Sequence, residues 1–378
     1  MKITPFHPRL PVAALALALL WSPTGWAQET RLANVSTLTR VGTGADVLTA
    51  GFVITGTAPR QVVIRAVGPT LGAAPFNVPG TLAKPQLTLF GPDSSTRIAA
   101  ANNDWSASDA ATFASVGAFA LQSGSRDAAI IATLQPGSYT AQVSGVGDTV
   151  GTAIVEVYEA GTGGRFANLS TRAQVSGTTN VLTPGFVITA GTGTRKLLIR
   201  AAGPALTPLG LAGALPNPTL TLVNTSTRAT VATNDNWSTP GGATTASATV
   251  LAGAFTQAGA FAFSANSLDA AILVDLPPGN YTVQVSGVAN AAGIALAEVY
   301  DLTPASLPAV SVVASRATSD ETGSRNGEFT FTRSGPTFEP LTVRYGVGGS
   351  AVNGFDYVSL PGTLTLPASA ATATVALL

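Results

Sequence analysis

Carboxylates, asparagines and arginines are the residues of this chain that could do chemistry, because histidine and cysteine are almost absent. The 378 residues include no Cys and a single His, His7, which lies in an N-terminal segment that we expect to be removed. Without imidazole or thiol groups, the mature chain cannot build a Ser-His-Asp triad, a Cys nucleophile, or the usual zinc, haem and iron–sulfur sites. Any metal cofactor must therefore be a hard cation held by oxygen ligands, and calcium is the one we expect.

One arginine and two acids recur in apolar surroundings in each half of the chain. They follow the same order in both halves: Arg65, Asp127 and Glu156, then Arg200, Asp269 and Glu298. Because a buried charge has to be paired, we expect each arginine to bind one of its two acids. The alternative is that an acid and an arginine line a ligand pocket.

Two turns rich in Asn and Asp, each ending in Trp, follow an apolar strand in each half. They are residues 102–105 (NNDW) and 234–237 (NDNW). Asx side chains satisfy the backbone of tight turns, and a buried Trp would anchor the corner. The alternative is calcium, with Asp104 and Asp235 as charged ligands, because Ca²⁺ takes about 6–8 oxygens. Exposed Trp rings would instead favour stacking on sugars.

The chain contains two copies of one unit. Residues 31–37 (RLANVST) return as residues 165–171 (RFANLST), and further matches follow in the same order, ending with EVY at 156–158 and 298–300. The period of about 135 to 140 residues is too long for a solenoid repeat. We therefore expect each copy to be a domain.

Short runs rich in Val, Ile, Leu, Thr and Tyr, bounded by Gly, Pro, Asn and Asp, predict strands. In the first copy they cover residues 47–54, 61–65, 86–90, 97–101, 128–134, 138–144 and 152–158. Residues 110–120 are expected to form a short helix or a loop, and the insertion between Trp237 and Asp269 a loop. The predicted fold class is all-β: two tandem antiparallel β-sandwich domains of jelly-roll-like form, followed by a partial immunoglobulin-like sandwich.

The first 27 residues have the pattern of a secretory signal peptide. An apolar run extends from Leu10 to Trp21, basic residues precede it, and Gly25 and Ala27 are the small residues before the expected cleavage point. The run is shorter than the ~20 apolar residues that a spanning helix needs, which disfavours the alternative of a membrane anchor. We expect no transmembrane segment in the mature chain.

Three domains are expected after the signal peptide of residues 1–27. The repeats set the first two at residues 28–162 and 163–303. A proline-containing linker and a change of composition set the third at residues 304–378.

The C-terminal segment, from about residue 307 to residue 378, contains a series of short motifs. They occur in order at residues 321–323 (ETG), 329–335 (FTFTRSG), 341–345 (LTVRY), 354–357 (GFDY) and 362–367 (GTLTLP). With this series the segment resembles a Calx-beta domain. The resemblance implies an immunoglobulin-like sandwich whose loops gather acidic residues around calcium, with Glu321 and Asp356 at ligand positions and Asp320 adjacent. The family's further acidic cluster follows the strand that is here 371–377, and the chain stops at Leu378 before it, so we expect an incomplete domain and site.

Each repeat has a strand, the Asn/Asp-Trp turn and a later PGxYTxQVSG strand, at residues 136–145 and 278–287, which together cover about half of each copy. In these features the repeats resemble the bacterial pre-peptidase C-terminal type of sandwich, which is found beside secreted enzymes. The resemblance implies an accessory module that is not catalytic.

The charge balance excludes one class of partner. There are 19 Lys and Arg against 19 Asp and Glu, and neither sign forms a run, whereas nucleic-acid binding requires a basic stripe.

We expect an exported, non-enzymatic structural or adhesion-type surface protein, whose partners are other surface proteins or glycans. The alternative is an array of carbohydrate-binding modules or an accessory part of a larger secreted enzyme. Hydrolysis by paired carboxylates needs no His, but no Asp/Glu pair recurs at a suggestive spacing.

Overall fold

A computed structural model describes residues 30–92, 97–161, 165–177, 180–191, 193–239, 246–303, 309–318, 326–335, 337, 340–349 and 351–378. The described residues up to Thr303 form one compact unit, and those from residue 309 onward belong to a second. The predicted signal peptide lies outside the described residues.

The strands expected in the first copy are confirmed, and one further strand precedes them. Their bounds are β1 (Leu32–Val41), β2 (Leu48–Thr55), β3 (Arg60–Val67), β4 (Pro85–Phe90), β5 (Arg97–Asn102), β6 (Ala128–Leu134), β7 (Gly137–Gly145) and β8 (Gly151–Ala160). Short helices connect them: α1 (Pro69–Gly72), α2 (Ala110–Ser115), η1 (Gly44–Asp46), η2 (Ala107–Asp109) and η3 (Val146–Asp148). The segment 110–120 thus begins with a short helix, which was one of the two expected forms.

The second copy repeats this order. Its strands are β9 (Arg165–Ser176), β10 (Thr183–Ile188), β11 (Arg195–Ala202), β12 (Pro218–Asn224), β13 (Ala229–Asn234), β14 (Ala270–Leu276), β15 (Gly279–Gly287) and β16 (Ala292–Asp301). Its helices are η4 (Pro204–Leu209), α3 (Ala248–Ala258) and η5 (Val288–Asn290).

The insertion in the second copy, expected to be a loop, contains the helix α3. Leu251, Ala254 and Phe255 recur at helical spacing and are buried, which gives the segment an apolar face. The Ser247 side chain caps the N-terminus, and Gly259 ends the helix with a left-handed φ of 64°. These capping residues and the apolar face explain why this Gly/Ala/Thr-rich stretch becomes helical.

Each copy has the strand order of a jelly roll. In the first copy, β1, β8, β3 and β6 belong to one sheet, and β2, β7, β4 and β5 to the other. In the second copy, β9, β16, β11 and β14 belong to one sheet, and β10, β15, β12 and β13 to the other. The predicted all-β sandwich class is therefore confirmed.

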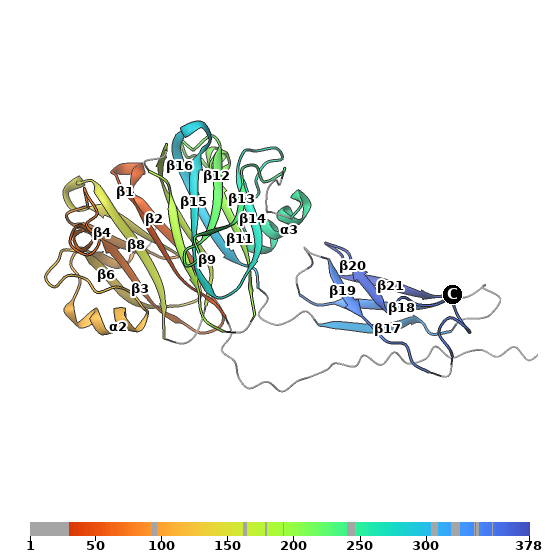
Figure 1. The fold of residues 1–378 in the computed structure, drawn as a ribbon. Helices are drawn as coiled ribbons and strands as arrows, with labels where there is room; N and C mark the ends of the chain where they lie inside the picture. The colour runs from red at the N-terminus through yellow and green to blue at the C-terminus, as the bar shows by residue number, and fades with distance from the viewer. Residues whose placement is uncertain are drawn as a thin grey trace, which may run out of the picture. The chain divides into compact units, whose positions relative to one another are not determined.

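The two jelly rolls are joined edge to edge (Figure 1). Sheet A has the order β13-β12-β15-β10-β1-β8-β3-β6, and sheet B has the order β14-β11-β16-β9-β2-β7-β4-β5. The joining pairs are β1 with β10 and β2 with β9, both antiparallel. The predicted boundary between residues 162 and 163 thus falls inside one compact unit, because pairing across it covers strand edges that each copy would otherwise expose.

The core lies between the two sheets and continues from one copy into the other. In β2, alternate residues from Leu48 to Ile54 are buried, as expected of a strand with one face inward. Phe52 stacks on Tyr139 with ring centroids 5.4 Å apart, and the equivalent pair, Phe186 and Tyr281, stacks at 5.5 Å. These pairs repeat one packing pattern in both halves.

A smaller apolar layer covers part of the outer face of sheet A. Phe113 of α2, Leu71 of α1 and Tyr158 of β8 are buried in it. In the second copy, α3 packs against β11 and β14 of sheet B. The outer faces therefore contain buried side chains wherever a helix lies over them.

The second unit is a small antiparallel sandwich. One sheet has the order β17 (Val310–Arg316), β18 (Gly327–Arg333), β21 (Thr372–Leu377), and the other pairs β19 (Leu341–Arg344) with β20 (Thr363–Leu366). Phe329, Phe331 and Tyr345 form its buried core. β21 corresponds to the strand expected at residues 371–377, and β18, β19 and β20 overlap the motifs at residues 329–335, 341–345 and 362–367.

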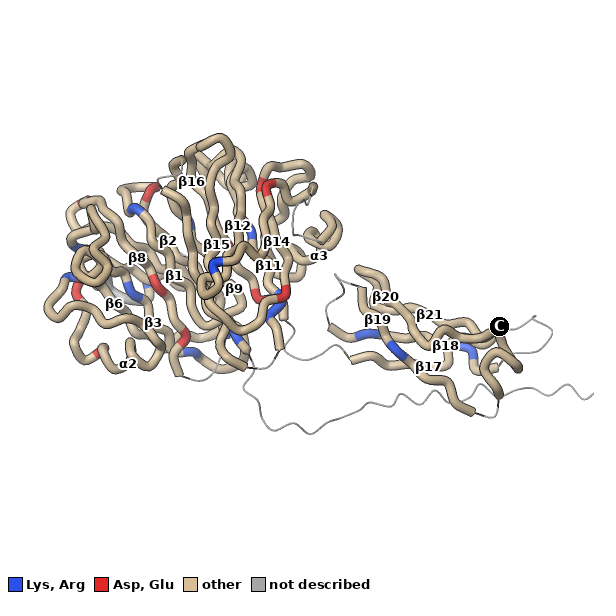
Figure 2. Tube along the Cα trace, viewed as in Figure 1, with Lys and Arg blue, Asp and Glu red and all other residues tan. Residues whose placement is uncertain are grey.

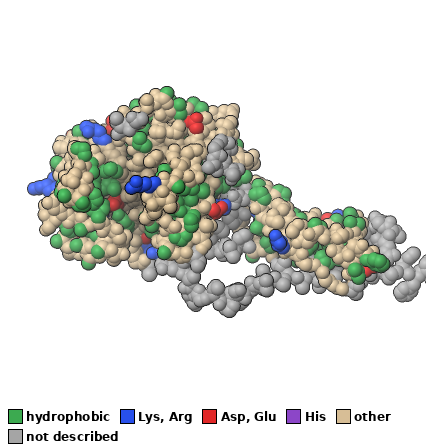
Figure 3. All heavy atoms as spheres, in the orientation of Figure 1, with side chains coloured by type: hydrophobic (Ala, Val, Ile, Leu, Met, Phe, Trp, Pro, Cys, Tyr) green, Lys and Arg blue, Asp and Glu red, His purple; other side chains and the backbone are tan. Residues whose placement is uncertain are grey.

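Charged residues are few and scattered along the trace in Figure 2. On the face shown in Figure 3, uncharged polar atoms and hydrophobic side chains predominate, and charged side chains occur singly. No helix in the described part of the chain is long and apolar enough to cross a bilayer.

Candidate functional site

Arg65 forms the buried ion pair that the sequence predicted, and its partner is Glu156. The Nε and Nη2 atoms of Arg65 donate to Glu156 Oε2 at 2.9 and 2.5 Å, and Nη1 donates to the Phe119 carbonyl at 2.6 Å. The guanidinium carbon lies 5.1 Å from the Phe113 ring and 4.5 Å from the Phe119 ring, within cation–π range. The Tyr158 hydroxyl donates to the other oxygen of Glu156 at 2.8 Å.

The second copy repeats this arrangement with Arg200 and Glu298. Arg200 Nε donates to Glu298 Oε2 at 2.8 Å and Nη2 donates to it at 2.5 Å, while Nη1 donates to the Phe261 carbonyl at 2.6 Å. The Tyr300 hydroxyl donates to Glu298 Oε1 at 2.6 Å. Both arginines are fully buried, so the arrangement is an internal pair rather than a pocket that receives a ligand.

Asp127 and Asp269, the other acids considered for these pairs, bind the backbone instead. Asp127 Oδ1 accepts from Gly68 N at 2.8 Å, and Asp269 Oδ1 accepts from Gly203 N at 2.7 Å. Each also accepts a hydrogen bond from a serine two residues earlier. Ser125 Oγ donates to Asp127 Oδ2 at 2.6 Å, and Ser267 Oγ donates to Asp269 Oδ2 at 2.8 Å. These carboxylates therefore hold the turn that follows β3 or β11.

The two Trp residues serve as corner anchors. Trp237 is buried, and Trp105 is half-buried against the apolar layer around α2. Their indole nitrogens donate to the same serines, Trp105 Nε1 to Ser125 Oγ at 3.0 Å and Trp237 Nε1 to Ser267 Oγ at 3.1 Å. This burial and bonding favour the corner-anchor interpretation over sugar stacking on these rings.

The turn of the first copy places Asp104 at the surface. Its Oδ2 lies 3.8 Å from Lys84 Nζ. The Asn102 side chain accepts from Asp104 N and from Ala129 N, both at 3.2 Å, and thereby ties the turn to β6. An ammonium group therefore lies at the limit of ion-pair distance from the carboxylate proposed as a calcium ligand.

The turn of the second copy differs, because Asn217 occupies the position of Lys84. With its amide nitrogen turned toward them, Asn217 donates to Asp235 Oδ1 and to the Leu268 carbonyl, both at 3.2 Å. Asn236 Oδ1 is buried and has no hydrogen-bond partner among the described residues. An open groove of about 460 Å³ lies over Asp235 and Asn236. Of the two turns, this one has the oxygen atoms better suited to a hard cation.

Asp356 is the predicted ligand of the second unit that lies within the described residues; Asp320 and Glu321 lie outside them. Asp356 is exposed, and its Oδ2 accepts from Val352 N at 2.7 Å. Among the residues that the structure describes, no group of three or more Asp, Glu, His or Cys side chains gathers to hold a metal ion.

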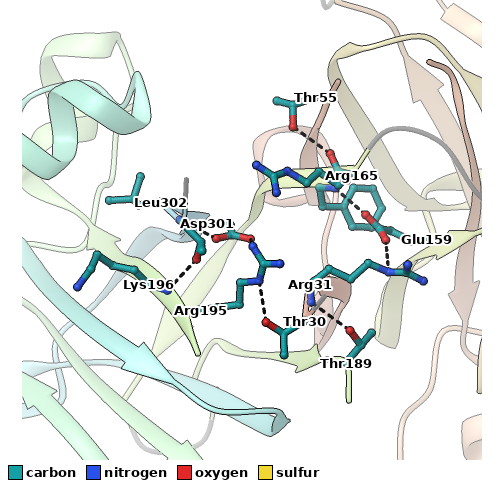
Figure 4. A network of polar contacts seen from close by, with 12 residues as sticks. Thr30, Arg31, Thr55, Glu159, Arg165, Thr189, Arg195, Lys196, Asp301 and Leu302 are labelled. Atoms are coloured by element: carbon teal, nitrogen blue, oxygen red, sulfur yellow. Dashed lines mark hydrogen bonds and ion pairs between the residues drawn. The ribbon is translucent and has the colours of Figure 1, made fainter. Parts of the chain in front are cut away.

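A further polar cluster, which sequence reasoning missed, lies where the two copies meet (Figure 4). Glu159 Oε2 lies 2.9 Å from Arg31 Nε and 3.2 Å from Arg60 Nη2, and its Oε1 accepts from Phe166 N at 2.7 Å. Burial raises the pKa of Glu159, although Arg60 acts in the opposite direction, and burial lowers the pKa of Arg60.

The other half of this cluster surrounds Arg195 (Figure 4). Its Nε donates to Thr30 Oγ1 at 3.1 Å, and its Nη1 lies 3.6 Å from Asp301 Oδ2. Arg31 N donates to Thr189 Oγ1 at 3.0 Å, so the segment before β1 is bound to the second copy. The repeat alignment, which matches Arg60 with Arg195, was the signal that could have revealed this cluster.

An open groove of about 560 Å³ on the outer face of sheet B is a second feature that sequence reasoning did not find. Residues of both copies line it, including Thr49 of β2, Thr140 of β7, and Ser170 and Arg172 of β9. The leucines of η4 and the following turn form one wall. It combines hydroxyl groups, one cation and an apolar surface.

Comparison of the chain with known protein families and with characterised proteins finds no match. The function therefore has to be inferred from the geometry of these sites.

Proposed function

We propose that this chain is a non-catalytic structural and adhesion-type module of an exported protein. The observation that carries the proposal is the joining of two jelly rolls into one core through the β1–β10 and β2–β9 pairs. Such a joint gives a rigid unit without disulfides, which suits a load-bearing surface protein. The buried charged groups, such as the Arg65–Glu156 pair, bind each other inside this unit and do not face a ligand.

Export rests on the N-terminal pattern. If residues 1–27 are a signal peptide, expression of the full chain in a bacterial host yields a protein outside the cytoplasm whose first residue is Gln28 or a close neighbour. Cell fractionation and N-terminal sequencing test this. Retention in the cytoplasm with an intact leader would overturn the proposal of export.

Calcium binding is the second part of the proposal. The resemblance to Calx-beta domains supports a site built from Glu321, Asp356 and Asp320, and the exposed carboxylate of Asp356 is available to a cation. Calorimetric titration with CaCl₂ at millimolar concentration should release or absorb heat and raise the melting temperature. Asp356→Asn should abolish the effect if this site is responsible, and Asp235→Asn if the turn of the second copy is. No heat and no shift in the wild-type chain would refute both sites.

Carbohydrate binding stays as the alternative function. The burial of Trp237 argues against sugar stacking on the two turn Trp residues. The groove on sheet B favours it, because the groove carries hydroxyl groups beside an apolar wall.

A further inference from the structure

The groove on sheet B is built from matched positions of neighbouring strands. Arg172 lies opposite Leu296 on one side and opposite Thr49 on the other. Ser170 lies opposite Gly51, and Gly51 lies opposite Thr140. All these side chains stand on the outer face, because their neighbours in sequence face the core. The strand register therefore creates a floor of hydroxyl groups around one arginine.

Gly51 keeps this floor open. A Cβ atom added at Gly51 would clash with Ser170 Oγ. Glycine within a strand often marks a place where a ligand or another backbone approaches closely. The groove is therefore not obstructed by a side chain at Gly51, where β2 of the first copy pairs with β9 of the second.

Arg172 has no partner among the described residues. It is half-buried, its Nε atom is buried without a hydrogen bond, and no ion pair involves its guanidinium. No acidic side chain lines the groove in the part of the chain that the structure describes. Glu298, which lies opposite Ser170 on β16, is already bound to Arg200. The groove thus presents one uncompensated positive charge.

The pseudo-equivalent face of sheet A shows what is particular to this groove. There, Ser36 lies opposite Gly185, and Leu38 lies opposite both Ile154 and Thr183. Leu38 is the counterpart of Arg172 in the repeat and is partly exposed. The hydroxyl and glycine positions are retained, whereas the position of Arg172 is occupied by a leucine on sheet A; the arginine of that face, Arg40, lies two residues further along β1.

We propose that the Arg172 groove binds a carboxylated saccharide. The guanidinium would pair with the carboxylate in a bidentate manner, and Thr49, Thr140 and Ser170 would exchange hydrogen bonds with sugar hydroxyls. Leu209 of η4, which is 63% exposed, would cover the apolar face of a sugar ring. The volume of about 560 Å³ is in the range of small-ligand sites, about 300–1,000 Å³. This inference gives the adhesion part of the proposed function a ligand and rests on it.

Calorimetric titration of the chain with trigalacturonate at low ionic strength tests the inference. We expect saturable binding that is weakened at least tenfold in Arg172→Leu, which reproduces the residue found on sheet A. Arg40→Leu, which removes an exposed arginine outside the groove, should retain the wild-type affinity. Leu38→Arg should add a second site on sheet A. The melting temperature of Arg172→Leu should match the wild type, because the described residues include no hydrogen-bond or ion-pair partner of Arg172.

Two ligand controls separate the parts of the proposal. Maltotriose, which is neutral, should bind at least tenfold more weakly than trigalacturonate, and acetate should not compete at the same concentration. Equal binding of trigalacturonate by Arg172→Leu, or no binding by the wild-type chain, overturns the proposal that the groove is a binding site. Competition by acetate overturns the proposed specificity for a saccharide and indicates a simple carboxylate site instead. If no trigalacturonate binds but residues 30–303 still unfold in one step, the inference about the groove fails and the structural part of the proposed function stands.

Discussion

Thr37 and Thr171 are equivalent residues of the two copies, and they hydrogen-bond to each other with their Oγ1 atoms 2.9 Å apart. Both are buried, at 1% and 0% exposure. A contact between equivalent residues is the mark of a twofold relationship, as in a symmetric dimer. The two copies of this chain are therefore arranged like the two subunits of such a dimer, although they belong to one polypeptide.

The losses of stability on removing these two hydroxyls, singly and together, should not be additive. Thr37→Val or Thr171→Val leaves a buried hydroxyl without a partner, and we expect each to lower the free energy of unfolding by about 1–3 kcal/mol. The double variant should lose less than the sum, because no unpaired hydroxyl is left. Urea unfolding of the four proteins measures this coupling. Strictly additive losses would contradict the contact.

The buried arginines should be important for stability. Arg65→Met and Arg200→Met leave Glu156 and Glu298 buried without partners, and we expect each to cost about 3–5 kcal/mol. Arg40→Met, on the surface, should change the stability by less than about 0.5 kcal/mol. Chemical denaturation compares the three. A neutral result for Arg65→Met would be incompatible with the ion pair.

Alkaline pH should destabilise the protein through two tyrosines. Burial raises the pKa of Tyr158 and Tyr300, and the neighbouring Glu156 and Glu298 carboxylates raise it further. A raised pKa stabilises the fold below the unfolded pKa, so this contribution falls as the pH rises above about 10 and the unfolded tyrosines ionise. The free energy of unfolding should then fall by about 1.4 kcal/mol per pH unit for each tyrosine.

The matched test is the substitution of these tyrosines by phenylalanine. Tyr158→Phe and Tyr300→Phe should each reduce the slope of stability against pH by one proton in the range above pH 10. At neutral pH each should cost about 1.5–3 kcal/mol, because the hydrogen bond that is lost is made to a buried carboxylate. If the double variant keeps the wild-type slope, these two groups are not its source.

The two copies should unfold together. Because they share one core and two continuous sheets, residues 30–303 are expected to unfold in one transition in calorimetry. The first copy alone, residues 28–162, would expose the edges of β1 and β2, so we expect it to dimerise or aggregate in size-exclusion chromatography. A stable monomer of the isolated copy would show that the joint is dispensable.

Much of the local structure could be predicted from the sequence. Alternating apolar residues and turn residues mark β2 and β7 without knowledge of the rest of the chain, since strand faces follow from a period of two. The need for a partner at Arg65 could also be predicted from its apolar surroundings. The sequence could not predict which acid Arg65 binds. Asp127 instead accepts hydrogen bonds from backbone amides after β3, and this contact forms only in the folded turn.

The sequence by itself determined the all-β class, the two copies, the strand positions and the kinds of residue that had to be paired. Only the tertiary structure decided that the copies share both sheets, that Thr37 meets Thr171, and that Arg172 stands in an open groove with no partner in the described part of the chain. The physical reason is the range of the interactions. Local pattern fixes which face of a strand is apolar, whereas pairing between strands more than a hundred residues apart depends on which edges and side chains the whole fold brings together.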